Sequence, residues 1–524
     1  MAKQDVTQAK TEIPEKEVKQ ILNDYKLARI SREMSVLGRK EVLTGKAKFG
    51  IFGDGKELPQ IVMAKYFKKG DFRSGYYRDQ TFMMAIGELT VQEFFSQLYA
   101  NPDVEADPNS VGRQMNAHFA TRLIDKEGEW KSQTSGKNTS ADMSPTSSQM
   151  PRLLGLAQAS KVYRENAELH DRTDFSKNGN EVAWGTIGDA STSEGHFWET
   201  VNAAGVLQVP MILSVWDDGY GISVSKKYQT TKESISKALR GLKRTKQEPG
   251  FEIYTVKAWD YEKLLEVYEE ASEISRKEHV PVLIHVEEVT QPQGHSTSGS
   301  HERYKDEERL KWEEEFCCCN QFREWILNEN LADASEMDEI EKEAKDYVRE
   351  EQKKAWKAFQ EPIKADKEEL VILLDELVQK ESDPDGLLED ILKKLKRKPN
   401  PIRKDVISSA RQAMRILVSS NSEEKKRLLD WLDEKIQVNE KKYNSHLYSE
   451  TKYSPLKVKE IKPEYPDEPR EVDGRVVLRD NFDAIFSRYP EAMVFGEDTG
   501  QLGDVNLGLE GMQDKYGKIR VADT

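Results

Sequence analysis

The sequence predicts the α/β fold class, with a parallel sheet and flanking helices, followed by a helical region and the start of a second α/β domain. Residues 15–290 alternate helix-like and strand-like patterns between short Gly and Pro turns, which is typical of parallel α/β domains. Residues 302–442 place apolar side chains three and four apart among Glu and Lys, which predicts helices with solvated faces. With 524 residues, the chain is too long for one compact core.

These patterns divide the chain into four parts. Residues 1–300 form the predicted α/β domain, and residues 301–453 form a helical extension. Residues 454–474 are rich in proline and predict a linker. Residues 475–524 restart a helix and a strand, which we interpret as the N-terminal fragment of a further α/β domain. Because about fifty residues are too few for an independent domain, we expect a continuation after residue 524.

Charge and composition argue against several classes of protein. The 79 basic and 94 acidic residues give a net charge of -15, which repels the phosphate backbone of nucleic acids. The mean hydropathy is -0.76, and no apolar run is long enough to cross a membrane. Residues 1–20 lack the apolar core of a secretory signal. Cys317, Cys318 and Cys319 are consecutive, which predicts buried thiols in a helix and a cytoplasmic location rather than disulfides or a metal site.

The segment from residue 181 to residue 216 predicts a strand, helix, strand unit. Residues 181–187 and 210–216 are apolar runs typical of buried strands, and residues 280–286 form a similar run further on. Residues 193–208 have helical periodicity, with Phe197, Val201 and Ala204 on one face. In open parallel sheets, ligands bind outside the carboxyl ends of the strands.

Acidic residues stand at both carboxyl ends of this unit. Asp189 follows the first strand, and Asp217 and Asp218 follow the second, so carboxylates from both turns can converge on one ion. Mg²⁺ prefers oxygen ligands and usually binds together with phosphates. The unit therefore predicts a metal-bridged diphosphate site. Taken alone, each acidic turn is also compatible with an ordinary turn that has no function.

The joint spacing of the two turns carries a family resemblance. Residues 191–216, a run of 26, separate GDA from DD, which resembles the thiamine diphosphate motif, written GDG and NN with a similar interval. The strings SEGHFWE, LQVP and GYGIS are similar to the alpha chain of the decarboxylating (dehydrogenase) component of 2-oxo acid dehydrogenase complexes. The resemblance implies a thiamine diphosphate-binding fold for residues 1–300.

The resemblance also implies roles for residues in this unit. Magnesium would be held by the carboxylates of Asp189 and Asp218 and by the backbone carbonyl of Tyr220. The resemblance further implies cofactor contacts at four positions: Gly188, Ala190, Ser191 and Ile222. Two departures from the motif stand out. Ala190 replaces a glycine that approaches phosphate, and the paired asparagines are aspartates here, which adds negative charge beside the metal.

Four further segments match the same family in order. GYYRDQ gives Tyr77 and Arg78, where the family binds the terminal phosphate, and an arginine fork suits phosphate oxygens. GRQMNAHF is similar to branched-chain members and contains His118. SPTSSQMP contains Ser144, which the resemblance places beside the cofactor's pyrimidine and a structural cation. QGHSTSGSHERY contains His295, which the resemblance places in contact with a phosphate. Singly, these segments are also typical of features without catalytic function: a surface ion pair, a structural histidine or a flexible Ser/Gly loop.

The resemblance extends to the end of the chain. Residues 494–524 resemble the opening of the family's beta chain, which implies an alpha chain fused to the start of a beta chain. In the family, the glutamate that protonates the aminopyrimidine lies just beyond this segment, so we expect a missing beta-type continuation. Fused chains would form a homodimer. The helical extension would cover the fused junction, or alternatively dock the acyltransferase core.

The predicted function is thiamine diphosphate- and Mg²⁺-dependent oxidative decarboxylation of a 2-oxo acid, with acyl transfer to a lipoyl group of a partner acyltransferase. His118 and His295 are the candidate catalytic residues, because histidine exchanges protons near neutral pH. The GRQM string favours branched-chain substrates such as 3-methyl-2-oxobutanoate. The alternatives are a pyruvate dehydrogenase component, a transketolase-like transferase, and a truncated chain that is catalytically silent.

Overall fold

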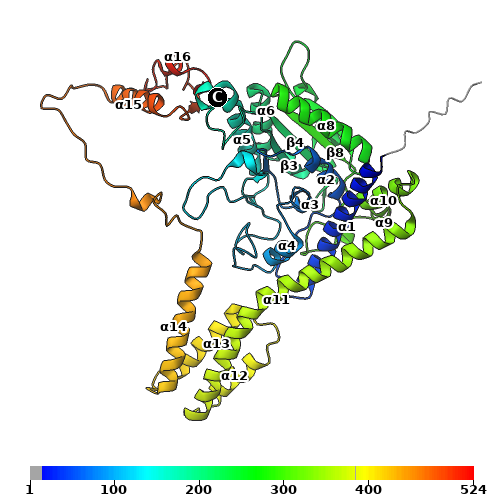
Figure 1. Cartoon of the computed structure of the whole chain (residues 1–524), viewed down its shortest axis with the longest axis vertical. Coiled ribbons are helices and arrows are strands. Elements are labelled where there is room, and N and C mark those ends of the chain that lie inside the picture. Colours follow the sequence, from blue (N-terminus) through cyan, green and yellow to red (C-terminus); the bar gives the residue numbers. More distant parts are fainter. Residues whose placement is uncertain (1–13, 384) are drawn as a thin grey trace, which may run out of the picture.

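The computed structural model describes residues 14–383 and 385–524. An α/β domain forms the body of the molecule, a helical arm projects from it, and an extended segment leads to a small C-terminal unit (Figure 1). The mixed α/β architecture confirms the predicted fold class. Among the described helices, none combines the length and the apolar character needed to span a bilayer.

A six-stranded sheet lies at the centre of the body. Its strand order is β2-β1-β3-β4-β8-β7, and every neighbouring pair is parallel. The carboxyl ends of all six strands therefore meet at one edge of the sheet. The strands have these bounds: β1 Phe72–Ser74, β2 Asn138–Thr139, β3 Ala183–Gly188, β4 Met211–Trp216, β7 Glu252–Lys257 and β8 Val282–Glu287.

Both faces of the sheet are buried, under two separate hydrophobic clusters. In β4, Ile212 and Trp216 join the larger cluster, whereas Leu213 and Val215 join the smaller one on the opposite face. This alternation is the period-two pattern of a strand, although the strand is apolar throughout because helices cover both faces. The helices of the body are α1 Glu15–Leu43, α2 Glu57–Tyr66, α3 Gln80–Ala85, α4 Val91–Leu98, α5 Gln149–Glu165, α6 Gly195–Leu207, α7 Ile235–Ala238, α8 Tyr261–Glu278, α9 Glu307–Glu315 and α10 Cys318–Asn328.

The predicted strand, helix, strand unit is β3, α6 and β4. Phe197, Val201 and Ala204 are buried on one face of α6, as predicted. The helix begins at Gly195 rather than at residue 193, because a short 3-10 turn, Ala190–Ser193, follows β3. In this turn the amide and hydroxyl of Thr192 both donate to the carbonyl of Asp189, at 3.1 and 2.6 Å.

The helical arm is built around α11, a single helix of 47 residues, Ala334–Lys380. Its first half packs in the larger cluster of the body, and its second half forms a separate core with the other arm helices. Phe359 packs against both cores, and Pro362 follows within the same helix. The remaining arm helices are α12 Leu387–Lys396, α13 Arg403–Ile416 and α14 Glu423–Asn444.

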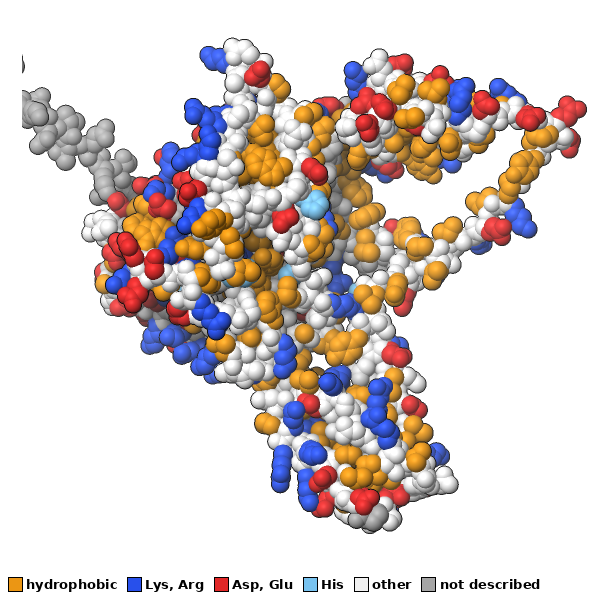
Figure 2. Space-filling model, turned by 180° about the vertical axis from the view of Figure 1, so that it is seen from behind, with side chains coloured by type: hydrophobic (Ala, Val, Ile, Leu, Met, Phe, Trp, Pro, Cys, Tyr) orange, Lys and Arg blue, Asp and Glu red, His pale blue; other side chains and the backbone are white. Residues whose placement is uncertain are grey.

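From residue 445 to residue 473 the chain has no α-helix or strand, and it contains turns at residues 445–446 and 452–453 and the short 3-10 turn Pro455–Lys457. The interdomain linker at residues 454–474 stays a prediction. From behind, this segment encloses an open space beside the body, and its apolar side chains, among them Leu456, are exposed (Figure 2). The side chain of Arg113 donates to the carbonyls of Tyr443 and Ser445 where the segment begins.

The C-terminal unit is small and has an α/β character of its own. Its two strands pair in parallel, and its helices α15 and α16 pack on them through a small buried cluster. The unit lies beside the end of α5, where the side chain of Asn166 donates to the carbonyl of Pro490 at 3.1 Å. Its elements are α15 Gly474–Arg488, β9 Val494–Gly496, α16 Met512–Tyr516 and β10 Val521–Asp523.

A buried histidine predicts how the stability of the body depends on pH. His279 caps α8 with φ 56°, and its Nε2–H donates to the carbonyl of Gly179 at 2.9 Å. Burial lowers its pKa from 6.5 to about 4. As the pH falls from 6.5 to 4, the unfolded chain therefore binds a proton that the folded chain does not, so folding loses on the order of 1–3 kcal/mol.

His279→Asn is expected to flatten the fall in the midpoint of thermal unfolding between pH 6.5 and 4.5. Asparagine accepts the left-handed backbone of this position, so the capping geometry is kept. The exposed His170 provides a matched control, and His170→Asn should leave the pH profile unchanged. An unchanged profile in the His279 variant would contradict the assignment.

Candidate cofactor site

Five loops meet at the carboxyl edge of the sheet, and each carries residues that the sequence analysis singled out. The loops follow β1, β2, β3, β4 and β8, which are consecutive in the sheet order. They position nearly all the predicted site residues, in this order along the chain: Tyr77 and Arg78, Ser144, Gly188 to Ser191, Asp218 to Ile222, and His295. His118 comes from a separate loop between α4 and β2.

Asp189 is buried at the end of β3. Its amide donates to the carbonyl of Trp216 at 3.1 Å, which ties the ends of β3 and β4 together. Its Oδ2 has no hydrogen-bond partner among the described residues. Burial, together with the charges of Asp218 and Asp217, raises the pKa of Asp189 well above its usual range. A buried carboxylate oxygen without a partner suits a cation that completes the site.

Asp217 is buried but already neutralised. Its Oδ2 accepts hydrogen bonds from Lys226 Nζ at 2.8 Å and from His285 Nε2 at 2.9 Å. Burial alone would raise the pKa of Asp217, but the hydrogen bond from His285 and the charge of Lys226 outweigh it and hold the pKa below its usual value. Asp217 is therefore a structural acid, and Asp218 is the next acid in the same loop.

Asp218 is half-buried and only loosely held. Its Oδ1 accepts the amide of Tyr220 at 3.1 Å, and its Oδ2 lies 3.9 Å from Lys56 Nζ. Its backbone carbonyl accepts a hydrogen bond from Arg309 at 2.8 Å. The guanidinium of Arg309 also lies over the ring of Tyr220, 5.4 Å from its centroid. Helix α9 thus fixes the loop that follows β4.

Ala190, at the third motif position, has room for its methyl group because the residue that faces it is Gly221. A Cβ built on Gly221 would lie 2.9 Å from the Cβ of Ala190, so the alanine methyl packs against the main chain of the β5–β6 hairpin, Tyr220–Gly221 and Val224–Ser225. Ile222, at the hairpin tip, has φ 60° and is exposed. Positive φ is strained for a β-branched residue, and strain of this kind often marks functional loops.

Arg78 is a buried cation without an acidic partner. It donates to the carbonyl of Phe52 at 2.6 Å and to the carbonyl of His295 at 2.9 Å. Within the described chain, no carboxylate lies within 4.0 Å of its guanidinium. Most buried charges are paired, so Arg78 is suited to hold an anionic ligand. The hydrogen bond from Arg78 to the His295 carbonyl also joins the loops that follow β1 and β8.

His118 and Ser144 lie in contact with each other. Nε2 of His118 lies 2.9 Å from the Ser144 hydroxyl, and its ring stacks on Tyr77 with centroids 6.1 Å apart. His118 is buried, whereas Ser144 is exposed. His295 is half-buried, and burial together with the nearby charge of Arg78 lowers its pKa to about 4. It is therefore neutral at pH 7.

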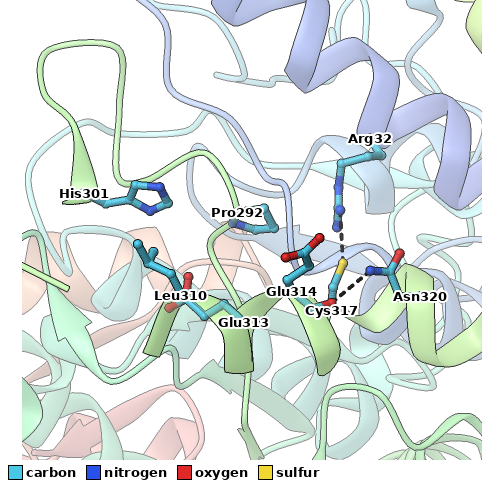
Figure 3. Close-up of a pocket in the computed structure, with 8 residues that line it drawn as sticks. All are labelled: Arg32, Pro292, His301, Leu310, Glu313, Glu314, Cys317 and Asn320. Carbon is cyan, nitrogen blue, oxygen red and sulfur yellow. Dashed lines mark hydrogen bonds between the residues drawn. The ribbon is translucent and has the colours of Figure 1, made fainter. Parts of the chain in front are cut away.

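A cavity of about 340 Å³ lies behind the loop that follows β8 (Figure 3). Arg32 reaches it from α1, and its NH1 donates to the Cys317 sulfur at 3.0 Å. The three cysteines are buried and free, at the start of α10, which confirms the predicted thiols. Glu57 lies near Cys318 and Cys319, but Arg32 already pairs with it at 2.7 Å. The cluster is therefore neutralised without a metal.

Sequence reasoning missed four polar residues of the site: Lys56, Lys226, His285 and Arg309. The string GDGKE at residues 53–57 was a usable signal for the first, because a glycine-rich turn before a helix is a common ligand-binding feature. Arg309 stands among many charged helical residues, and His285 stands inside an apolar strand. Neither has a pattern that would distinguish it.

The parallel sheet thus gathers three aspartates and the unpaired cation of Arg78 at its carboxyl edge, where open parallel sheets bind their ligands. The profile of one family, the dehydrogenase E1 component, matches residues 25–364. The chain belongs to this family. The match covers the body from within α1 onward and about the first two thirds of α11, and the rest of the arm and the C-terminal unit lie outside it.

Several relatives of known function are alpha subunits. The chain is 28% identical to 2-oxoisovalerate dehydrogenase subunit alpha of Bacillus subtilis over 49% of this chain and 65% of that one. It is 25% identical to the mitochondrial subunit alpha of the same name in Mus musculus, over 67% and 69%. The pyruvate dehydrogenase E1 component subunit alpha of Rickettsia bellii is 23% identical, over 33% and 50%. The chain thus spans between half and about two thirds of these relatives.

Proposed function

We propose that this chain binds thiamine diphosphate with Mg²⁺ and takes part in the oxidative decarboxylation of a 2-oxo acid, with acyl transfer to a lipoyl group. One observation carries the proposal. The partnerless Oδ2 of buried Asp189 lies at the same sheet edge as Asp218 and the unpaired cation of Arg78. The two aspartates offer carboxylate oxygens to a cation, and the guanidinium of Arg78 offers two N–H donors to a phosphate. Family membership supports it.

The residues present fit a metal-bound diphosphate. Asp189, Asp218 and the carbonyl of Tyr220 would hold Mg²⁺, while Asp217 stays paired with Lys226. Arg78 and Tyr77 would hold the terminal phosphate. The other proposed cofactor contacts are Ser144, Gly188, Ala190, Ser191, Ile222 and His295. The methyl of Ala190 packs on Gly221, so the departure from glycine is compatible with the site.

When bound, thiamine diphosphate supplies the carbon that attacks the 2-oxo group and the ring that accepts the electrons released on decarboxylation. The protein holds the reacting groups in position and exchanges protons with them. Neutral His295 offers a hydrogen bond, and an anionic ligand beside it favours its charged form. The Ser144 hydroxyl orients the His118 ring at 2.9 Å. These two histidines are the proposed catalytic residues.

For the substrate, we propose a branched-chain 2-oxo acid such as 3-methyl-2-oxobutanoate. The names of the Bacillus and mouse relatives favour it, and the Rickettsia relative makes pyruvate the alternative. Rates of 2-oxo acid-dependent reduction of an artificial electron acceptor, compared for both acids, test this choice. A preference for pyruvate would overturn it. Activity with sugar phosphates alone would favour the transketolase-like reading.

We further propose a lipoylated acyltransferase partner, a homodimer and a cytoplasmic location. The proposal of an acyltransferase partner rests on family membership. The proposed location rests on the three free thiols. The parallel pair β9 and β10 supports a beta-type α/β unit at residues 475–524. Co-purification with the acyltransferase, light scattering and cell fractionation test these proposals separately. A monomer by light scattering would overturn the dimer.

Titration of thiamine diphosphate, with and without Mg²⁺, tests the cofactor proposal directly. Tryptophan fluorescence is a suitable readout, because Trp216 is buried at the end of β4 beside Asp189. We expect saturable quenching that requires Mg²⁺. Binding without turnover would identify a catalytically silent chain. Absence of binding at millimolar cofactor would overturn the cofactor proposal for this chain.

Arg78→Gln is expected to weaken thiamine diphosphate binding about 30-fold, because a buried charge-assisted contact to phosphate contributes roughly 2 kcal/mol. Thiamine monophosphate, which lacks the terminal phosphate, should bind the variant and the wild type equally. Arg78→Lys keeps the charge without the fork and should fall between them. Equal losses for both ligands would place Arg78 elsewhere in the site.

A further inference from the structure

Lys56 is a buried lysine at the carboxyl edge of the sheet. It stands just before α2, and its side chain is 1% exposed. Its Nζ donates to Gln291 Oε1 at 2.8 Å and lies 3.9 Å from Asp218 Oδ2. Only one neutral amide therefore accepts directly from this ammonium group among the contacts found, although a buried ammonium has three donors to satisfy.

The backbone before Lys56 is built for this placement. Gly55 has φ +86°, which favours glycine, and a Cβ at Gly55 would lie 1.9 Å from the carbonyl oxygen of Thr290. The turn is thereby pressed against the loop that follows β8, which carries Gln291 and His295. The backbone that carries Lys56 is thus held in place by a close contact with the loop after β8.

Two other acids stand beside Lys56 in the chain, and neither is within 4.0 Å of its Nζ. Glu57 is paired with Arg32 at 2.7 Å. Asp54 Oδ2 accepts the amide of Gln293 at 2.9 Å, whereas its buried Oδ1 has no hydrogen-bond partner among the described residues. Within the described residues, Asp218 is the one carboxylate within 4.0 Å of Lys56 Nζ. Asp217 has its own lysine, Lys226, at 2.8 Å. Each aspartate of the DD pair thus faces a lysine of its own.

We propose that Lys56 is the counter-ion of Asp218: it competes with a cation for this carboxylate in the cofactor-free site and stabilises the added negative charge once a metal-bound diphosphate is present. The proposal rests on the proposed function for its second half. An aspartate beside a diphosphate would repel it, and a buried ammonium offsets that repulsion. Without diphosphate, the same ammonium opposes an incoming cation.

Lys56→Met should therefore change two affinities in opposite directions. Measured by electron paramagnetic resonance, Mn²⁺ alone should bind the variant at least threefold more tightly than the wild type. Thiamine diphosphate in saturating Mg²⁺ should bind at least tenfold more weakly by calorimetry. Lys56→Gln, which keeps a hydrogen bond available to Gln291, provides a second variant if the first does not fold.

The double variant Lys56→Met with Asp218→Asn tests whether the two residues act as a pair. With asparagine at 218, the change at residue 56 should alter the affinity for Mn²⁺ alone less than twofold and weaken cofactor binding much less. Lys65→Met is the matched control: Lys65 lies at the other end of α2 and pairs with Asp24 at 2.6 Å. It should change neither affinity.

Several outcomes would overturn the pairing: weaker Mn²⁺ binding in the Lys56 variant, no Mn²⁺ binding by either protein, or equal effects with aspartate and asparagine at 218. Equal effects would make Lys56 a direct phosphate ligand instead. If the wild type bound no thiamine diphosphate, the proposed function would fail. The pairing would still be supported if Mn²⁺ affinity rose in the single variant and not in the double variant.

Discussion

Asp189→Asn is expected to weaken the binding of thiamine diphosphate with Mg²⁺ by about 100-fold or more, because loss of a buried charged partner costs roughly 3 kcal/mol. The same change should stabilise the cofactor-free protein at pH 7. Asp189 is buried beside two other aspartates, and its Oδ2 has no partner. Calorimetric titration and thermal unfolding, each with and without ligand, measure the two effects.

The pH dependence of this stabilisation has a definite sign. The folded state holds the proton of Asp189 above the ordinary pKa of 3.8, so wild-type stability falls as the pH rises above that value. The gain from asparagine should therefore vanish below pH 4. Asp217→Asn is the matched control and should destabilise the protein, because Lys226 and His285 favour the charged form of Asp217. Equal stability changes in both variants would refute the distinction.

Arg73→Leu is expected to cost about 3–5 kcal/mol of unfolding free energy, because it leaves buried carboxylates unpaired. Arg73 is fully buried in β1. Its guanidinium pairs with Asp79 at 2.6 Å and Asp142 at 3.0 Å, and it donates to the Tyr76 carbonyl at 3.0 Å. These bonds join the loops after β1 and β2, so chemical denaturation should show the loss and cofactor binding should weaken with it.

Two variants sharpen this prediction. The triple variant with Asp79→Asn and Asp142→Asn should recover part of the loss, since the unpaired charges are gone. Arg349→Leu serves as the control. Arg349 is exposed on α11 and lies 3.9 Å from Asp346, so its loss should cost less than about 1 kcal/mol. A loss below 1 kcal/mol for Arg73→Leu would show that the acids find other partners.

Local patterns were sufficient to predict most of the fold. The apolar runs became β3, β4 and β8 to within about two residues, and the proline-rich stretch is extended up to α15. The sheet order and the length of α11 were not predictable, because strand neighbours are decided by tertiary packing. Pro362 would ordinarily predict a break, but neighbouring turns and two cores hold the helix together.

The site was predictable where its residues follow strands. The sheet brings Arg78 to His295 and His118 to Ser144, but the roles of these residues stay predictions. The neutralisation of Asp217 was not predictable, because Lys226 is separated from it by a hairpin and His285 by a whole strand crossover. Ile222 is exposed at the hairpin tip, and like the other site residues it remains a prediction.

The position of Pro362 within α11 implies that a small bend there would move the far end of the arm. It stands where α11 leaves the core of the body and enters the core of the arm, next to Phe359, and it lacks the amide that would bond to the preceding turn. From there to Lys380 the helix extends for about 27 Å at 1.5 Å per residue. A bend of about 10° at the proline would thus swing the far end of the helix by roughly 5 Å.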